Sequence, residues 1–158
     1  MINQDDGPRR ALLLQASLDS AQRARAHREA LLVLRSSIET AHIDAYSNAP
    51  WPHEVLAFHE RALLLGQDAV AQGTRSAKND PGMGIDIDVR DDAQFEILVN
   101  LAPHTIHAEG RRGSRTVFTA SDTGSAPWAS VTQPQEAELT SRLMAYGIAP
   151  TAFGVDPR

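Results

Sequence analysis

The sequence predicts an α+β fold. We expect an N-terminal helical hairpin over about residues 8–72, a mostly antiparallel sheet of about four strands over residues 85–131, and a C-terminal helix over residues 133–146. Three observations support this class. Helix-forming side chains dominate the first 46 residues, apolar side chains recur at every second position after residue 85, and a helix-start signal at Thr132 precedes a glycine stop at Gly147.

The segment from Pro8 to Tyr46 has no internal Gly or Pro and is rich in Ala, Leu, Arg and Glu, which favour a helix. An unbroken helix of this length would be about 60 Å long, whereas a compact domain of this size is about 40 Å across. Two arrangements therefore stay open. Either the helix breaks near residue 19, where Asp19 can cap a new start with Gln22 three residues later, or it projects and pairs with a second copy of the chain.

A second helix is predicted from Pro52 to about Gln72, after two prolines that turn the chain. Its apolar residues recur at spacings of three and four, as on one face of a helix. The connection to the first helix is short, so the two helices should be antiparallel neighbours. The residues of the apolar stripe are Val55, Phe58, Ala62, Leu65 and Ala69.

Residues 73–84 form a predicted loop, rich in Gly, Asn, Asp and Pro, before the strands begin. Apolar residues alternate with polar ones from Ile85 to Val89 and again from Phe95 to Leu101, the pattern of strands that cover a core with one face. Further strands are expected over residues 104–109, 115–119 and, shorter, 128–131. Their closeness in sequence favours an antiparallel meander.

The C-terminal helix carries the strongest local signals. Thr132 followed by Gln135 matches a capping box, and Gly147 stands where a left-handed terminal residue is wanted. Residues 150–158 are expected to form a loose tail. The whole chain, residues 1–158, is expected to fold as a single domain.

Composition narrows the classes of function. The chain has 15 Lys and Arg against 20 Asp and Glu, so a general attraction to phosphate backbones is absent and nucleic-acid binding is disfavoured. Without cysteine it has neither disulfides nor thiolate sites. No apolar stretch approaches the roughly 20 residues that a membrane span needs, and we expect a cytoplasmic protein with no membrane partner.

Acidic residues concentrate in the segment "GIDIDVRDDAQFEIL", residues 84–98. Three interpretations are open: the solvated outer face of a sheet, a docking surface for a basic protein partner, and a metal site. The residues assigned to the docking surface are Asp86, Asp88, Asp91, Asp92 and Glu96.

The metal interpretation depends on strand register. A tight turn after Arg90 would place Asp88 opposite Glu96, and the next turn would bring His107 and Glu109 to the same face. Oxygen-rich sets of this kind suit Mg²⁺ or Mn²⁺. The alternative function is therefore a Mg²⁺- or Mn²⁺-dependent phosphodiester hydrolase.

Histidines near the predicted hairpin have two interpretations. His42 and His59 could meet across the hairpin as a metal pair, whereas His27 and His59 both fall within apolar arcs. A partly buried neutral histidine bonded to a carbonyl or carboxylate is the more ordinary outcome.

The sequence contains no nucleophile elbow, phosphate-binding glycine loop or His-Glu-x-x-His pattern. We therefore expect a non-enzymatic interaction module, such as a small inhibitor, immunity or accessory factor. It would bind a protein through the acidic sheet face or the helical hairpin and need no cofactor. A further alternative is a structural module that forms homo-oligomers through the long first helix.

Overall fold

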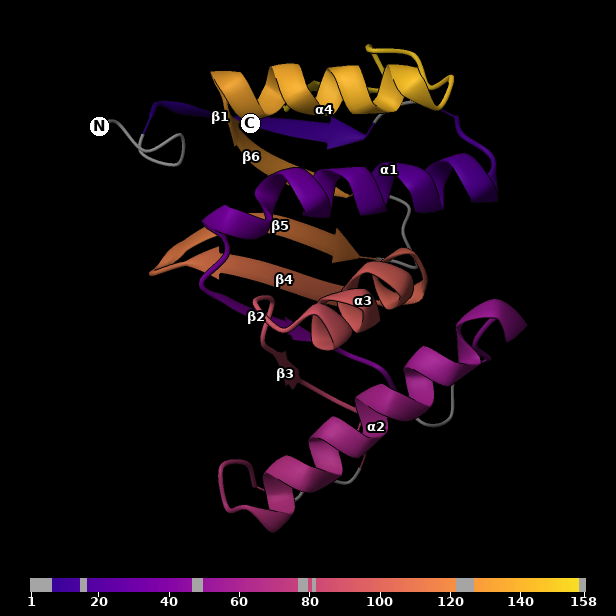
Figure 1. Cartoon of the computed structure of the whole chain (residues 1–158), viewed down its shortest axis with the longest axis vertical. Helices are drawn as coiled ribbons and strands as arrows, with labels where there is room; N and C mark the ends of the chain where they lie inside the picture. The colour runs from indigo at the N-terminus through magenta and orange to yellow at the C-terminus, as the bar shows by residue number, and fades with distance from the viewer. Residues whose placement is uncertain are drawn as a thin grey trace.

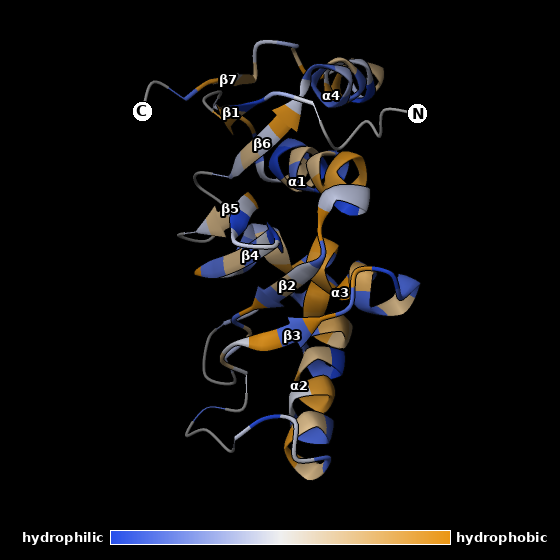
Figure 2. Cartoon of the chain, turned by 90° about the vertical axis from the view of Figure 1, so that its left-hand side faces the viewer, coloured by the Kyte–Doolittle hydropathy of each residue, from blue (hydrophilic) through white to orange (hydrophobic). Residues whose placement is uncertain are grey.

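The structure is a computed structural model that describes residues 7–14, 17–46, 50–76, 80, 82–121 and 127–156. Within these residues it is an α+β fold with one seven-stranded antiparallel sheet in the order β3-β2-β4-β5-β6-β1-β7. The α-helices lie on one face of the sheet, and none of the described helices covers the other face, which we call the uncovered face (Figures 1 and 2).

The elements follow one another along the chain as β1 (Arg9–Leu14), α1 (Ser20–Leu34), β2 (Thr40–Ile43), α2 (Leu56–Ala71), β3 (Ile85–Ile87), α3 (Asp92–Leu101), β4 (His107–Arg112), β5 (Arg115–Ser121), β6 (Trp128–Thr132), α4 (Gln133–Ala145) and β7 (Phe153–Val155). Short 3₁₀ turns at Arg35–Ser37, His53–Val55 and Ala102–His104 join some of them.

The prediction of one long N-terminal helix was wrong, because this region forms β1, α1 and β2. Leu12 and Leu14 alternate with half-exposed residues, and β1 bonds to β6 on one edge and to β7 on the other. These pairings outweigh the helix propensity of the leucines. The helix start predicted at Asp19 is confirmed, since the Asp19 carboxylate accepts a hydrogen bond of 2.8 Å from the Gln22 N–H, but a strand and not a helix precedes it.

The predicted helical hairpin is also wrong, because β2 separates α1 from α2. Only α2, after a 3₁₀ turn at His53–Val55, matches the predicted second helix. Helix α1 is 15 residues long and packs against α3 and α4 instead of projecting. The long helix that suggested a homo-oligomer therefore does not form.

The predicted strand over Phe95–Leu101 is helix α3. Phe95, Leu98 and Leu101 recur at helical spacing and are almost fully buried, and Ile97 and Val99 are buried as well. A helix that is apolar on most of its surface shows the every-second-position pattern by coincidence. Asp91 caps the helix by accepting a hydrogen bond of 3.1 Å from the Gln94 N–H.

β3, β5 and β6 lie close to the predicted strands, and the capping box of α4 is confirmed. The strand predicted over residues 104–109 is displaced, because β4 begins at His107 and continues to Arg112. Gly147 ends α4 with a left-handed φ of 73°. The loose tail was wrong: β7 pairs with β1, and Ala152 and Phe153 are 1% and 7% exposed. The C-terminal segment thus completes one edge of the sheet.

The core lies between the sheet and α1, α3 and α4, with α2 packed beside β3 and α3. No helix among the described residues is long and apolar enough to cross a membrane. The largest fully buried side chains include Leu31, Leu34, Ile43, Ile85, Phe95, Leu98, Phe118, Leu139 and Leu143.

Candidate functional site

The acidic segment is split between an edge strand, a turn and a helix, and it does not form one sheet face. Asp86 lies on β3 directly across from His42 on β2 and is exposed. Asp88 follows β3, where its carboxylate accepts a hydrogen bond of 3.0 Å from the Arg90 N–H and lies 3.6 Å from the Arg90 Nε. The predicted pairing of Asp88 with Glu96 is wrong, because Glu96 is on a helix.

The other three acidic residues have structural partners. Asp91 caps α3, Asp92 lies in the first turn of α3, where a negative charge is favourable, and Glu96 faces α1. The Asp92 carboxylate lies 2.7 Å from the Arg35 Nη2. Both Glu96 oxygens accept hydrogen bonds of 3.2 Å from Arg28. These intramolecular contacts explain the positions of Asp91, Asp92 and Glu96 without a protein partner. The docking role of all five acidic residues stays a prediction.

The uncovered sheet face holds a cluster of two histidines and one glutamate. His42 on β2 lies directly opposite Glu109 on β4, and His107 is two residues before Glu109 on the same strand. The Glu109 Oε2 is 3.6 Å from the His42 Nε2 and 3.4 Å from the His107 Nε2. The two imidazole centroids are 5.5 Å apart. We call His42, His107 and Glu109 the open-face cluster.

Glu109 is held by Arg111 of its own strand and by Thr116 of the neighbouring β5. Its Oε1 accepts hydrogen bonds from the Arg111 Nε at 2.7 Å and from the Thr116 Oγ1 at 3.0 Å. Burial by itself would raise the pKa of Glu109, but hydrogen bonds from Thr116, Arg111 and His107 and the charge of Arg111 lower it below its ordinary value. The carboxylate is therefore ionised, with Oε2 facing the imidazoles.

The cluster contains two of the four residues predicted as metal ligands, His107 and Glu109, but neither Asp88 nor Glu96. Sequence reasoning missed His42 as their neighbour because it placed His42 in a helix beside His59. The alternation of buried Ala41 and Ile43 around His42 could have indicated a strand with the imidazole on the outer face.

Two other histidines have the ordinary buried role. The His59 Nε2 lies 3.0 Å and 2.9 Å from the carbonyl oxygens of Ala45 and Tyr46. The His27 Nδ1 donates a hydrogen bond of 2.7 Å to the Arg23 carbonyl, and its side chain is fully buried. Burial lowers the pKa of His27 to about 4, so this histidine is neutral at pH 7.

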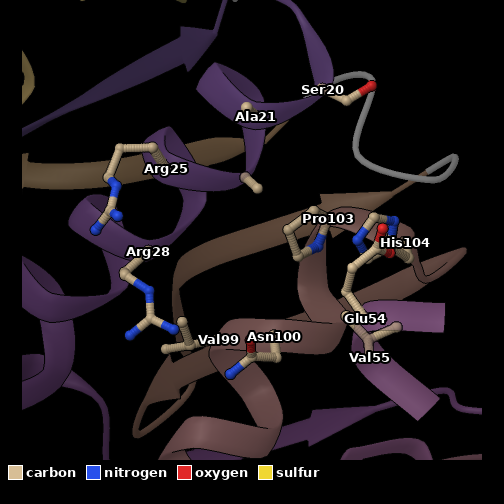
Figure 3. A pocket seen from close by; sticks show the side chains of 11 residues that line it. Ser20, Ala21, Arg25, Arg28, Glu54, Val55, Val99, Asn100, Pro103 and His104 are labelled. Atoms are coloured by element: carbon tan, nitrogen blue, oxygen red, sulfur yellow. The ribbon is translucent and has the colours of Figure 1, made fainter. Parts of the chain in front are cut away.

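A cleft of about 450 Å³ opens between α1, α3 and the two short 3₁₀ turns beside them. Figure 3 shows Arg25 and Arg28 of α1 along one side and Asn100, Glu54 and His104 along the other. The cleft is thus lined by groups of both charge signs.

The polar groups of this cleft are largely engaged with one another. Arg28 binds Glu96, whose Oε2 also accepts a hydrogen bond of 3.1 Å from the Asn100 Nδ2. Burial lowers the pKa of His104, and the nearby charge of Glu54 opposes that shift. Ser20, the first residue of α1, also lines the cleft.

Helix α2 extends past the β3 edge of the sheet (Figure 2) and is only partly covered. Its buried residues are His59, Ala62 and Gly66. Leu56, Leu64 and Val70 remain 40%, 56% and 38% exposed. Solvent-facing positions of a helix are ordinarily polar, and we call these three exposed apolar side chains, with the polar residues between them, the α2 surface.

Comparison of the chain with protein-family models, with curated proteins and with solved structures finds no match.

Proposed function

We propose that this chain is a non-enzymatic protein-interaction module that binds a basic protein partner through the α2 surface. The observation that carries the proposal is the exposure of Leu56, Leu64 and Val70 on a helix that the rest of the fold covers along one narrow strip. Exposed apolar side chains of this size, with polar neighbours, are typical of protein contact sites.

Charge supports a basic partner. From His53 to Gln72 the chain carries the exposed carboxylates of Glu54, Glu60 and Asp68 and one guanidinium, that of Arg61. Arg61 lies over the Phe58 ring, 5.3 Å from its centroid. On a helical wheel, Glu60 falls between Leu56 and Leu64. A partner with an apolar centre and surrounding Lys or Arg residues would therefore complement this helix.

Two of the predicted docking residues lie on or next to β3. Asp86 and Asp88 are exposed on and after β3, the strand beside which α2 packs. A partner that covers α2 and the β3 edge would reach both carboxylates. Rim charges of this kind raise the association rate, and salt weakens their effect.

Site-specific photo-cross-linking in the native cell tests the location of the surface. A photoreactive amino acid is placed at Leu64, which is 56% exposed, and at Met144 on α4, which is 57% exposed and serves as the matched control. We expect a discrete cross-linked partner from position 64 only. Equal cross-linking from both positions would contradict the proposal.

Binding measurements with the purified cross-linked protein test the chemistry. Leu64→Ser should weaken binding at least about tenfold if Leu64 is a buried contact. Asp86→Asn with Asp88→Asn should reduce the salt dependence of the association rate, because rim charges act through steering. The proposal would be overturned if the captured protein is acidic. It would also be overturned if neither Leu64→Ser nor the double Asp86→Asn, Asp88→Asn substitution alters binding.

A further inference from the structure

The open-face cluster converges although its residues come from two strands. Antiparallel pairing puts His42 and Glu109 directly opposite each other, and the two-residue period of β4 puts His107 on the same face as Glu109. The ligand atoms of the three side chains all lie within 4.8 Å of one another. No other group of three or more such residues converges in this way among the described residues.

The separations match those within a metal coordination sphere. A tetrahedral ion bound at 2.0–2.1 Å holds its ligand atoms about 3.3–3.4 Å apart. The distances from the Glu109 Oε2 to the two imidazole nitrogens are 3.4 Å and 3.6 Å, which are close to the separation between two ligand atoms of a tetrahedral ion. The two imidazole nitrogens need to approach by at most about 1.4 Å, which side-chain rotation at the half-exposed His42 and His107 can supply.

The carboxylate is oriented for this role. Arg111 and Thr116 bind the Glu109 Oε1, so that Oε2, the oxygen nearer to both imidazoles, faces His42 and His107, where a bound ion would take the place of the His107 hydrogen bond. Hydrogen bonds to the outer atoms of a ligand fix its orientation and strengthen a metal site. The Glu109 side chain is only 15% exposed, whereas His42 and His107 are 35% and 38% exposed, so an ion can enter from the uncovered face.

We propose that His42, His107 and Glu109 bind a divalent transition-metal ion such as Zn²⁺ or Co²⁺, with at least one coordination position open to water. Two imidazoles with one carboxylate suit these ions, whereas Mg²⁺ selects oxygen ligands. This site differs from the predicted oxygen-rich Mg²⁺ or Mn²⁺ set in its residues and in its metal. It does not depend on the α2 surface.

Titration calorimetry of the full chain without a polyhistidine tag tests the site, with ZnCl₂, CoCl₂ and MgCl₂ as separate titrants. We expect one Zn²⁺ per chain, a rise in melting temperature with Zn²⁺, and the intense visible absorption of tetrahedral cobalt with Co²⁺. His42→Gln, His107→Gln and Glu109→Gln should each weaken Zn²⁺ binding at least about tenfold. MgCl₂ should give no heat.

His53→Gln is the matched control, because His53 is an exposed imidazole on another element. It should leave Zn²⁺ affinity unchanged. Melting curves without metal establish whether each variant folds. If Glu109→Gln fails to fold, the site is tested with His42→Gln, because a substitution at this half-exposed position should leave the fold intact. Absence of Zn²⁺ binding at millimolar concentration, or equal loss in the His53 and His42 variants, would overturn the site.

Discussion

The buried His27 should make the protein less stable in mild acid. Its side chain is fully buried, the Nδ1 is bonded to the Arg23 carbonyl, and the Nε2 has no hydrogen-bond partner among the described residues. Burial is the largest cause that lowers its pKa from 6.5 to about 4, and the charges of His104 and Arg23 add to that shift. A proton on this imidazole would therefore be a buried charge.

The direction follows from which state binds the proton first. Between pH 6.5 and pH 4 the unfolded chain protonates His27 whereas the folded chain does not, so the free energy of unfolding falls as the pH falls through this window. The shift corresponds to about 2 kcal/mol lost between pH 7 and pH 5, and to about 3 kcal/mol once the pH is below 4.

Urea unfolding at pH 7 and pH 5, followed by tryptophan fluorescence, measures this loss. His27→Gln should remove about 2 kcal/mol of the difference between the two pH values, because glutamine does not titrate but can still donate to the Arg23 carbonyl. His53→Gln, which removes an exposed imidazole, should retain the wild-type difference. If His27→Gln and the wild-type chain lose the same stability on acidification, the reasoning is refuted.

Three further predictions concern stability, each checked by denaturant unfolding. Phe153→Ala should cost about 3 kcal/mol, because Phe153 is 7% exposed and a buried aromatic ring is removed; a cost below about 1 kcal/mol would restore the loose tail. Thr132→Ala should cost about 1 kcal/mol through the lost α4 cap, and an unchanged midpoint would contradict it. Gly110→Ala should destabilise the fold, because a Cβ there would lie 2.8 Å from the Ile38 Cδ1. Adding Ile38→Val should recover part of the lost stability. If the double variant instead loses the sum of the two single costs, this contact is contradicted.

Local hydrogen-bonding signals in the sequence were reliable predictors of helix starts. The Asp19 and Thr132 caps are both formed, each with a glutamine three residues later. The same spacing, Asp91 followed by Gln94, marks the start of α3, although the alternation of apolar residues there predicted a strand. A cap needs only neighbouring residues, so it can be predicted locally, whereas alternation in a nearly all-apolar segment is ambiguous.

Strand pairing decided what local patterns could not. The Ala- and Leu-rich β1 has the composition of a helix, but β6 and β7 supply hydrogen-bond partners on both its edges. His107 and Glu109 were predicted as site residues through pairing with a strand at residues 95–101, which is helix α3. Their actual partner His42 reaches them because β2 lies beside β4. Sequence reasoning therefore found two members of the open-face cluster and missed the third.

The sequence by itself determined the α+β class, the acidic balance, the caps of α1 and α4, and strands at β3, β4, β5 and β6, because these features depend on composition and on residues close along the chain. Only the tertiary structure decided that β1, β2 and β7 extend the sheet, that the acidic segment divides between an edge strand and α3, and that His42 meets Glu109. The strand pairings depend on hydrogen bonds between residues far apart in sequence, and they are selected by the packing of the whole sheet against its helices.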